Sequence, residues 1–188
     1  MNNSRYEIRL SGSGGQGLIL AGIILAEAAC IHDGKEAVQT QSYGPESRGG
    51  ASKSEVVISG EEIDYPKVTS PDLLLAMTQE ACDKYAGDLK HDGIVLVDSD
   101  LAQNCASADG HVYSLPLTAT AREVTGKTIA ANIVALGAIV ALSGVVSRMA
   151  VETAVLARVP KGTEEMNLQA LRAGFDAVAG AQTEVRVA

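Results

Sequence analysis

The sequence contains few aromatic residues, with no Trp and a single Phe among 188 residues. Hydrophobic residues still make up 46% of the chain, which excludes a disordered polypeptide. The core must therefore be built mainly from Ala, Val, Leu and Ile. A chain of this length suits a single core, and no linker-like stretch divides it, so we expect one domain over residues 1–188.

The sequence also lacks an excess of positive charge. Its formal net charge is -8, which argues against binding to nucleic acid or to an acidic membrane surface. Met1–Arg5 has no signal-peptide apolar core. The longest apolar stretch, Ile129–Val146, is interrupted by Asn132 and by Gly and Ser residues. It therefore favours a buried or interface helix over a membrane span. We predict neither a nucleic-acid nor a membrane partner.

Cysteine is sparse and carries no metal-binding spacing. The three residues Cys30, Cys82 and Cys105 are far apart, and no Cys-x-x-Cys occurs. An odd count without a secretory signal favours a reducing, cytoplasmic setting. The chain is a poor candidate to hold an iron–sulfur cluster or a zinc ion by itself. The three His residues do not cluster with Cys or carboxylates at ligand spacing, so no metal site is predicted.

Apolar runs alternate with helical patterns along the chain. Strands are predicted at Tyr6–Leu10, Ala37–Gln41, Ser54–Ser59, Leu73–Met77, Ile94–Val97 and His111–Leu115. Helices are predicted at Gly17–Ile31, Gln79–Tyr85, Thr128–Ser143, Ala150–Ala157 and in a last segment capped by Thr163. This order predicts a three-layer, Rossmann-like α/β domain with a mainly parallel sheet. Ile63–Tyr65 is expected to pair with Ser54–Ser59 in a hairpin excursion, and the Ala-rich C-terminal helices are expected to pack as a group.

The first glycine loop reads Gly12-Ser13-Gly14-Gly15-Gln16-Gly17, between a predicted strand and a predicted helix. Backbone N–H groups at a helix start can bind an anion. The letters match a dinucleotide fingerprint, but Gln39–Gln41 places no acid at the end of the second strand to hold a ribose. Three readings stay open: glycines that only let the helix pack closely, a dinucleotide site, or a ligand contact completed by another chain.

The second glycine loop reads Ser42-Tyr43-Gly44-Pro45-Glu46-Ser47-Arg48-Gly49-Gly50. Arg48 is a planar donor suited to phosphate or carboxylate, and Glu46 can orient it. The structural alternative is an ion pair within the loop, with Tyr43 packed on the core.

Three further polar residues require an explanation. Asn132 lies in an apolar helix, where an amide must find a partner. It is either a satisfied core residue or is bonded to one of the glycine loops. Asp98 and Asp100 follow a buried strand, at the edge where parallel sheets place ligands. Loop capping is favoured over metal binding for this pair.

The two glycine loops together resemble the gamma subunit of 2-oxoacid:ferredoxin oxidoreductases. The resemblance continues through Ser54–Ser59, through Pro71-Asp72, through Asn132 and through Asn167, Ala170 and Gly174, and it covers nearly the whole chain. Among relatives the chain looks most like the gamma subunit of a 2-oxoglutarate enzyme, while pyruvate, branched-chain and indolepyruvate versions stay open.

The resemblance implies a division of labour among subunits. In the family, alpha and beta subunits bind thiamine diphosphate and magnesium, iron–sulfur clusters pass electrons to ferredoxin, and coenzyme A is the substrate that collects the acyl group. A ferredoxin-like delta subunit is a further expected partner. The gamma domain packs on alpha and helps enclose the coenzyme A region. The chain lacks the Gly-Asp-Gly…Asn thiamine motif and cluster cysteines, so we expect no cofactor and no turnover in the chain alone.

The expected interface or ligand-binding residues are those of both glycine loops and Asn132, with no catalytic residue. Gly14–Gly17 would offer N–H groups to coenzyme A or to a neighbouring subunit, Arg48 would pair with a phosphate or acid, and Tyr43 would shape the wall near the acyl-thiamine site. The rival hypotheses are a free-standing dinucleotide-binding oxidoreductase and a non-catalytic assembly module.

Overall fold

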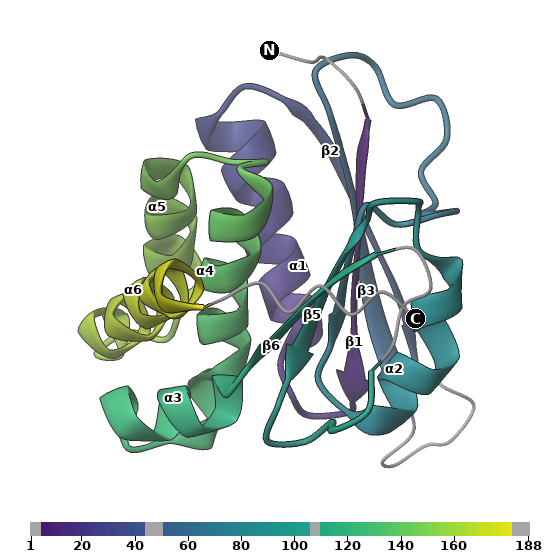
Figure 1. Cartoon of the computed structure of the whole chain (residues 1–188). Coiled ribbons are helices and arrows are strands. Elements are labelled where there is room, and N and C mark those ends of the chain that lie inside the picture. The colour runs from purple at the N-terminus through teal and green to yellow at the C-terminus, as the bar shows by residue number, and fades with distance from the viewer. Residues whose placement is uncertain (1–4, 44–50, 106–109, 182–188) are drawn as a thin grey trace.

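The computed structural model describes residues 5–43, 51–105 and 110–181, which form a sheet flanked by helices (Figure 1). The sheet has six strands in the order β2-β3-β1-β4-β5-β6. The strands are β1 Tyr6–Ser13, β2 Glu36–Tyr43, β3 Ala51–Ser59, β4 Leu73–Ala76, β5 Ile94–Asp98 and β6 His111–Leu115. Each lies where the sequence predicts a strand, although β1, β2 and β3 are each longer than expected.

Strand β3 is the exception to the parallel pattern of this sheet. It pairs antiparallel with both β1 and β2, whereas β1, β4, β5 and β6 pair in parallel. The predicted α/β fold with a mainly parallel sheet and a hairpin is thereby confirmed. The predicted partner within the hairpin is wrong, because β3 pairs with β2 and Ile63–Tyr65 is not a strand.

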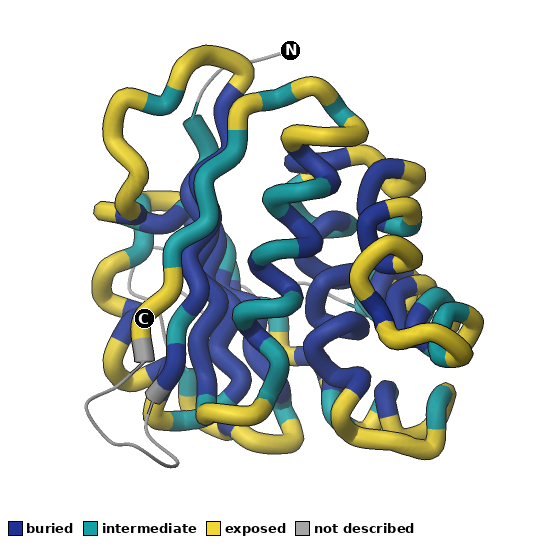
Figure 2. Tube along the Cα trace, turned by 180° about the vertical axis from the view of Figure 1, so that it is seen from behind, coloured by how far each residue is buried: buried dark blue, intermediate teal, exposed yellow. Residues whose placement is uncertain are grey.

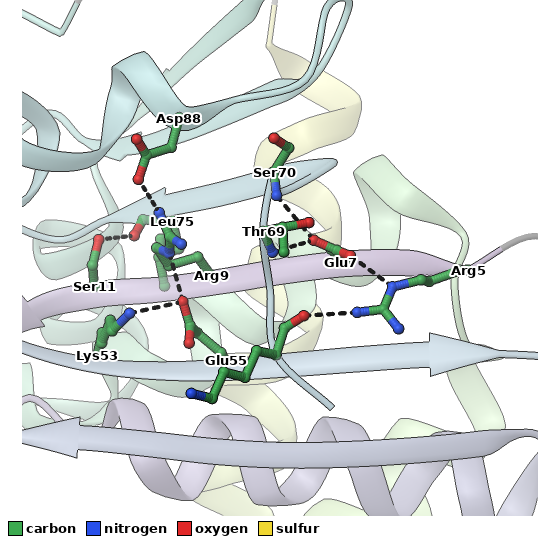
Figure 3. Close-up of polar contacts among 11 residues, drawn as sticks. Arg5, Glu7, Arg9, Ser11, Lys53, Glu55, Thr69, Ser70, Leu75 and Asp88 are labelled. Atoms are coloured by element: carbon green, nitrogen blue, oxygen red, sulfur yellow. Dashed lines mark hydrogen bonds and ion pairs between the residues drawn. The ribbon is translucent and has the colours of Figure 1, made fainter. Parts of the chain in front are cut away.

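Side chains of Arg5, just before β1, and of Glu7 in β1 hold the connection between β3 and β4 without a neighbouring strand. Arg5 donates to the carbonyl oxygens of Tyr65 and Lys67, at 2.6 and 2.7 Å. The Glu7 carboxylate accepts hydrogen bonds from the backbone N–H groups of Thr69 and Ser70 (Figure 3). Buried or half-buried backbone groups need partners. Here charged side chains supply them, so the segment needs no strand pairing.

Five of the six helices of the described residues match predicted segments with small shifts at their ends, and Leu117–Thr125 is an additional helix. They are α1 Leu18–Glu27, α2 Gln79–Tyr85, α3 Leu117–Thr125, α4 Ala131–Ser143, α5 Arg148–Arg158 and α6 Glu164–Gly180. A π-helical turn, Ala28–His32, extends α1, and single 3₁₀ turns follow α2 and precede α4. Figure 1 shows α2 on one face of the sheet and the other helices on the opposite face. The expected grouping of the C-terminal helices is confirmed.

The core lies mainly between the sheet and the larger helical layer, as the band of buried residues in Figure 2 shows. Ile8 and Leu10 of β1 face this layer and are fully buried. In α1, Gly22 approaches β3 so closely that a Cβ atom would lie 2.2 Å from Ser54 Oγ. The missing side chain of Gly22 thus permits the tight helix–sheet contact.

Thr163 precedes α6 but does not cap it as predicted. Its hydroxyl donates to the Pro160 carbonyl at 2.7 Å and accepts from Asn167 Nδ2 at 3.0 Å, and it makes no capping bond to the first turn. The hydroxyl therefore closes the preceding turn instead. Among the described residues, no helix is long and apolar enough to cross a membrane.

Two cysteines that the sequence left unpaired are joined in the structure. Cys82 of α2 and Cys105 form a disulfide, with their Cα atoms 5.7 Å apart. Cys30 is free and exposed.

Helices α4 and α6 touch through glycine. A Cβ atom on Gly137 would lie 2.1 Å from the Leu171 carbonyl oxygen, and one on Gly174 would lie 2.0 Å from the Val134 carbonyl oxygen. Both obstacles are backbone atoms, so rotation of a side chain cannot relieve the clash. The contact therefore requires glycine on both helices.

We predict that Gly137→Ala lowers the free energy of unfolding by about 3 kcal/mol, because it overpacks a backbone contact. Urea denaturation of the isolated chain measures the change. The matched control is Gly180→Ala in α6, where a Cβ atom would meet nothing within 4 Å. Equal stabilities of the two variants would show that the α4–α6 contact can relax.

We predict that Glu7→Gln destabilises the chain by about 2 kcal/mol at pH 7, because hydrogen bonds to a buried charged group are lost. Burial by itself would raise the pKa of Glu7, but the bonds from Arg5, Thr69 and Ser70 outweigh it and hold the pKa below 4.5. The contribution is therefore present above that value and lost as the pH falls through the lower pKa of the folded state.

The difference in unfolding free energy between wild type and Glu7→Gln should accordingly shrink in urea titrations below pH 4.5. The exposed Glu165→Gln serves as the control and should change stability little at either pH. If the difference in unfolding free energy between wild type and Glu7→Gln stayed constant down to pH 3, the assignment of a negatively charged Glu7 carboxylate would be contradicted.

Candidate functional site

The first glycine loop lies at the carboxyl end of β1. The strand continues to Ser13, so Gly12 and Ser13 belong to the sheet and the turn itself comprises residues 14–17. This corrects the predicted strand end at Leu10. The extension follows from pairing with β3, whose residues Ser52 and Ala51 lie opposite Gly12 and Ser13.

Gln16 organises the turn from within. Its Oε1 accepts a hydrogen bond from the Ser13 N–H at 2.7 Å, and its Nε2 donates to the Met77 carbonyl at 3.4 Å. A Cβ atom on Gly12 would lie 2.2 Å from that Oε1 atom and 2.9 Å from the Met77 Cβ. Gly12 is therefore required for the close approach of the loop to the end of β4.

Gly17 joins the loop to both α1 and α4. It adopts a left-handed conformation with φ 72°, immediately before α1. Asn132 Nδ2 donates to the Gly17 carbonyl at 3.1 Å, and a Cβ atom on Gly17 would lie 2.5 Å from that nitrogen. Of the two alternatives for the buried Asn132 amide, the structure shows the hydrogen bond to a glycine loop. A role for Asn132 in ligand binding stays a prediction.

Gly14 and Gly15 form the open part of the loop. Both are exposed, and a Cβ atom at either position would meet nothing within 4 Å. Gly15 has φ 90°, a conformation that favours glycine, whereas Gly14 has no positive φ. The backbone here is thus uncovered by side chains of the described residues and accessible to a partner or ligand.

Asp98 and Asp100 cap α3 instead of marking a metal site. The buried Asp98 carboxylate accepts from the Thr118 hydroxyl and from the backbone N–H groups of Asp100 and Thr118, and Asp100 Oδ2 accepts from the Ala119 N–H. Burial raises the pKa of Asp98, although these hydrogen bonds act in the opposite direction. Among residues 5–43, 51–105 and 110–181, no group of three or more His, Cys, Asp and Glu side chains could hold a metal ion.

The second glycine loop begins at the same end of the sheet. Ser42 is exposed near the end of β2, opposite Lys53 of β3. Gly44, Pro45, Glu46, Ser47, Arg48, Gly49 and Gly50 lie outside the described residues, as does the side chain of Tyr43. Ala51, which follows Gly50 directly, pairs with Ser13 of the first glycine loop. After the second glycine loop, the chain therefore re-enters the sheet beside the first glycine loop.

A charged cluster on the α2 face of the sheet is a feature that the sequence did not reveal (Figure 3). Arg9 is 5% exposed and donates to Glu55 at 2.8 Å and to Asp88 at 2.6 Å. Lys53 also contacts Glu55, at 3.0 Å, and the Arg9 guanidinium lies over the Tyr85 ring, 5.1 Å from its centroid. A buried charge needs such partners, so the cluster ties β1 and β3 to the end of α2. The alternation of polar and apolar residues in β1 and β3 is the signal that could have indicated it.

The geometry disfavours the dinucleotide reading of the first loop. In that reading, the acid that holds the ribose ends the strand next to β1. Here β3 lies between β1 and β2, which places the end of β2 two strand spacings, about 10 Å, from β1 instead of one. The fold thus defines a Rossmann-like α/β domain with a modified first crossover. Both glycine-rich segments follow strands at the carboxyl end of β1 and β2.

The chain belongs to the pyruvate ferredoxin/flavodoxin oxidoreductase family, whose model matches residues 7–177. It is 56% identical over 174 residues to 2-oxoglutarate synthase subunit KorC of Methanocaldococcus jannaschii, covering 92% of this chain and 93% of that relative. The family resemblance seen in the sequence is thereby confirmed.

Two solved structures are similar to this one. The gamma subunit of a keto/oxoacid ferredoxin oxidoreductase from Geobacter sulfurreducens has a TM-score of 0.89 and 56% identity, covering 96% of this chain and 99% of that chain. A 2-oxoglutarate:ferredoxin oxidoreductase from Magnetococcus marinus, solved with 2-oxoglutarate, coenzyme A and succinyl-CoA, has a TM-score of 0.83. At 24% identity this second match shows the fold alone, and it covers 98% of this chain but 33% of that chain.

We predict that Asn132→Ala speeds hydrogen exchange of the amides in residues 14–17 about fivefold, because it removes a hydrogen bond worth about 1 kcal/mol. Hydrogen exchange read by mass spectrometry on peptides covering the first glycine loop measures the effect.

The matched control is Asn167→Ala. Asn167 is as buried as Asn132, but its Nδ2 donates to Thr163 at the start of its own helix. Exchange in the first glycine loop should therefore stay unchanged in that variant. The same acceleration in both variants would indicate a general loss of stability instead of a specific support of the loop.

Proposed function

We propose that the chain is the gamma subunit of a cytoplasmic 2-oxoglutarate:ferredoxin oxidoreductase, which oxidatively decarboxylates the 2-oxoacid to an acyl-CoA and CO₂. The 56% identity to a 2-oxoglutarate synthase subunit and to a solved gamma subunit, each over nearly the full length of both chains, supports this assignment. The alpha, beta and ferredoxin-like delta subunits are the proposed partners.

The reactive groups of the complex belong, in this proposal, to the companion subunits. Thiamine diphosphate with magnesium supplies the carbanion chemistry, and iron–sulfur clusters carry the electrons to ferredoxin. The described residues of this chain offer no cluster of metal ligands, and its described cysteines are a disulfide pair and one exposed thiol. The chain's own contribution is therefore to bind and enclose.

The observation that carries this role is that the strands flanking the second glycine loop end and begin at the same end of the sheet as the first glycine loop. Ser13 of the first loop pairs with Ala51, the residue after the second loop, and Gly14 and Gly15 present uncovered backbone beside it. Backbone N–H groups of residues 14–17 would contact an anionic part of coenzyme A or the alpha subunit. Arg48 would pair with a phosphate or with an acid across the interface.

Enclosure by these loops would limit hydrolysis of the acylated intermediate. Excluding water strengthens electrostatic contacts and suppresses side reactions in a closed site. Gln16 and Asn132 hold the first loop from two sides, so the wall would be rigid before the partner binds. Tyr43 would shape the part of the wall that faces the thiamine.

We predict that Gly14→Leu leaves the stability of the isolated chain within about 0.5 kcal/mol of wild type, because the site is open and φ is not positive. In the reconstituted complex the added side chain would occupy the space of the ligand or the partner. The Michaelis constant for coenzyme A should rise about tenfold, or subunit association should weaken.

The control is Gly180→Leu, a second exposed glycine with nothing within 4 Å, which should change neither property. Arg48→Ala, matched with Arg172→Ala on α6, separates the two roles. A higher Michaelis constant with intact assembly supports contact with coenzyme A, whereas lost association with an unchanged constant favours a pure assembly module. Wild-type behaviour of both Gly14→Leu and Arg48→Ala would overturn the proposed role of the loops.

The assignment itself is tested by activity. The chain purified alone should not reduce a viologen dye with 2-oxoglutarate and coenzyme A, whereas the complex with alpha, beta and delta subunits should. Oxidation of a 2-oxoacid by the isolated chain, or a dinucleotide bound to it in stoichiometric amount, would reject the proposal.

A further inference from the structure

The disulfide between Cys82 and Cys105 lies outside everything that the proposed function uses. Cys82 is 2% exposed in the core between α2 and the sheet, whereas Cys105 is half-buried in the segment that follows β5. In the reducing setting expected from the sequence, persistent structural disulfides are rare, and those that form are commonly transient or redox-sensing. The pair therefore needs an explanation of its own.

Contacts other than the disulfide already hold the two sulfur-bearing segments together. Gln79 Oε1 accepts from the backbone N–H groups of Gln103 and Asn104, at 3.0 and 3.1 Å. Gln79 Nε2 donates to the Asn104 carbonyl at 2.8 Å. Gln79 lies one helical turn before Cys82, and Asn104 immediately precedes Cys105. One amide side chain thus fixes the approach of the two cysteines.

The chain before Cys105 is also anchored. Ala102 is 2% exposed and packs in the same apolar cluster as Cys82. Its backbone N–H donates to the Asp98 carbonyl at 2.9 Å, at the end of β5. The two Cα atoms, 5.7 Å apart, therefore lie between segments that are positioned without the covalent bond.

From this arrangement we infer that Cys82 and Cys105 are a reversible thiol–disulfide pair, a site of oxidative modification that Gln79 holds ready to close. Because the segments stay together when the bond is broken, closure is intramolecular and the effective concentration of one thiol at the other is high. The inference concerns this chain alone and does not depend on the companion subunits.

The reaction balances with a low-molecular-weight disulfide as the oxidant. Each cysteine thiol gives up one electron and one proton, the Sγ–Sγ bond forms, and glutathione disulfide is reduced to two glutathione thiols. The two sulfur atoms are not equivalent, because Cys82 is buried and Cys105 is half-buried. Exchange therefore passes through a mixed disulfide on Cys105, and Cys82 is the thiol that resolves it.

The test uses the full chain with Cys30→Ser, which removes the exposed thiol. The chain is equilibrated in glutathione redox buffers, starting from both the oxidised and the reduced form. Free thiols are then alkylated, and the mass of the chain is measured by mass spectrometry. We expect one two-electron transition that is the same in both directions, without unfolding. A bond that glutathione cannot cleave in the native chain, or a pair that never forms, would overturn the inference.

Trapping variants test the asymmetry. In the same background, Cys82→Ser should accumulate glutathione on Cys105, whereas Cys105→Ser should leave Cys82 unmodified in the folded chain. Equal modification of both variants would contradict the assigned order of attack.

Gln79→Ala tests the positioning role. It should lower the equilibrium constant for disulfide formation about tenfold, because the thiols lose their alignment. Gln169→Ala, an exposed Gln on α6, is the control and should leave the constant unchanged. An unchanged constant in Gln79→Ala, with the fold verified by urea denaturation, would reject the role of Gln79.

Discussion

The antiparallel strand β3, inserted between β1 and β2, is the constraint on which the rest of the structure depends. A simple crossover would place β2 directly beside β1, with its end next to the first glycine loop. The inserted strand instead places its own first residue there, and with it the end of the second glycine loop. One change in strand order thus disfavours a nucleotide site of the usual kind and places the two loops at a common edge.

Close backbone contacts keep this edge rigid. The loop turns tightly because Gly12 leaves room for the Gln16 amide and Gly17 for the Asn132 amide. Asn132 itself lies in α4, which packs on α6 through glycines of both helices. Backbone atoms of the opposite helix occupy the space that a Cβ atom would need at these glycines. The path from the loop to the C-terminal helix therefore consists of contacts that tolerate almost no added volume. Rigid support of this kind is what a surface needs if it is to enclose a ligand that other chains hold.

On the opposite face of the sheet, the part formed by β1 and β3 is organised by charge. Arg9 is buried, and its guanidinium is satisfied by Glu55, Asp88 and the Tyr85 ring, while Glu7 accepts backbone hydrogen bonds from the connection before β4. Beyond α2, the described residues place no helix on this face comparable to the layer on the other side (Figure 1). The polar network gives β1 and β3 partners there that an apolar core supplies elsewhere. The chain therefore uses two means of stabilising one sheet.

The sequence by itself determined the class of fold, the positions of nearly all strands and helices, and the family. Apolar runs and helical periodicity are local properties of the sequence. The two glycine loops are sequence motifs that are specific for the family when they occur together. It also indicated that the buried Asn132 amide must find a partner. Tertiary structure alone decided that this partner is Gly17, that Ile63–Tyr65 stays outside the sheet, and that β3 separates β1 from β2. It also decided that α3 is the segment that Asp98 and Asp100 cap, and that Cys82 meets Cys105. Each of these depends on segments far apart in the chain, and a local pattern carries no information on which distant group satisfies a buried donor, acceptor or thiol.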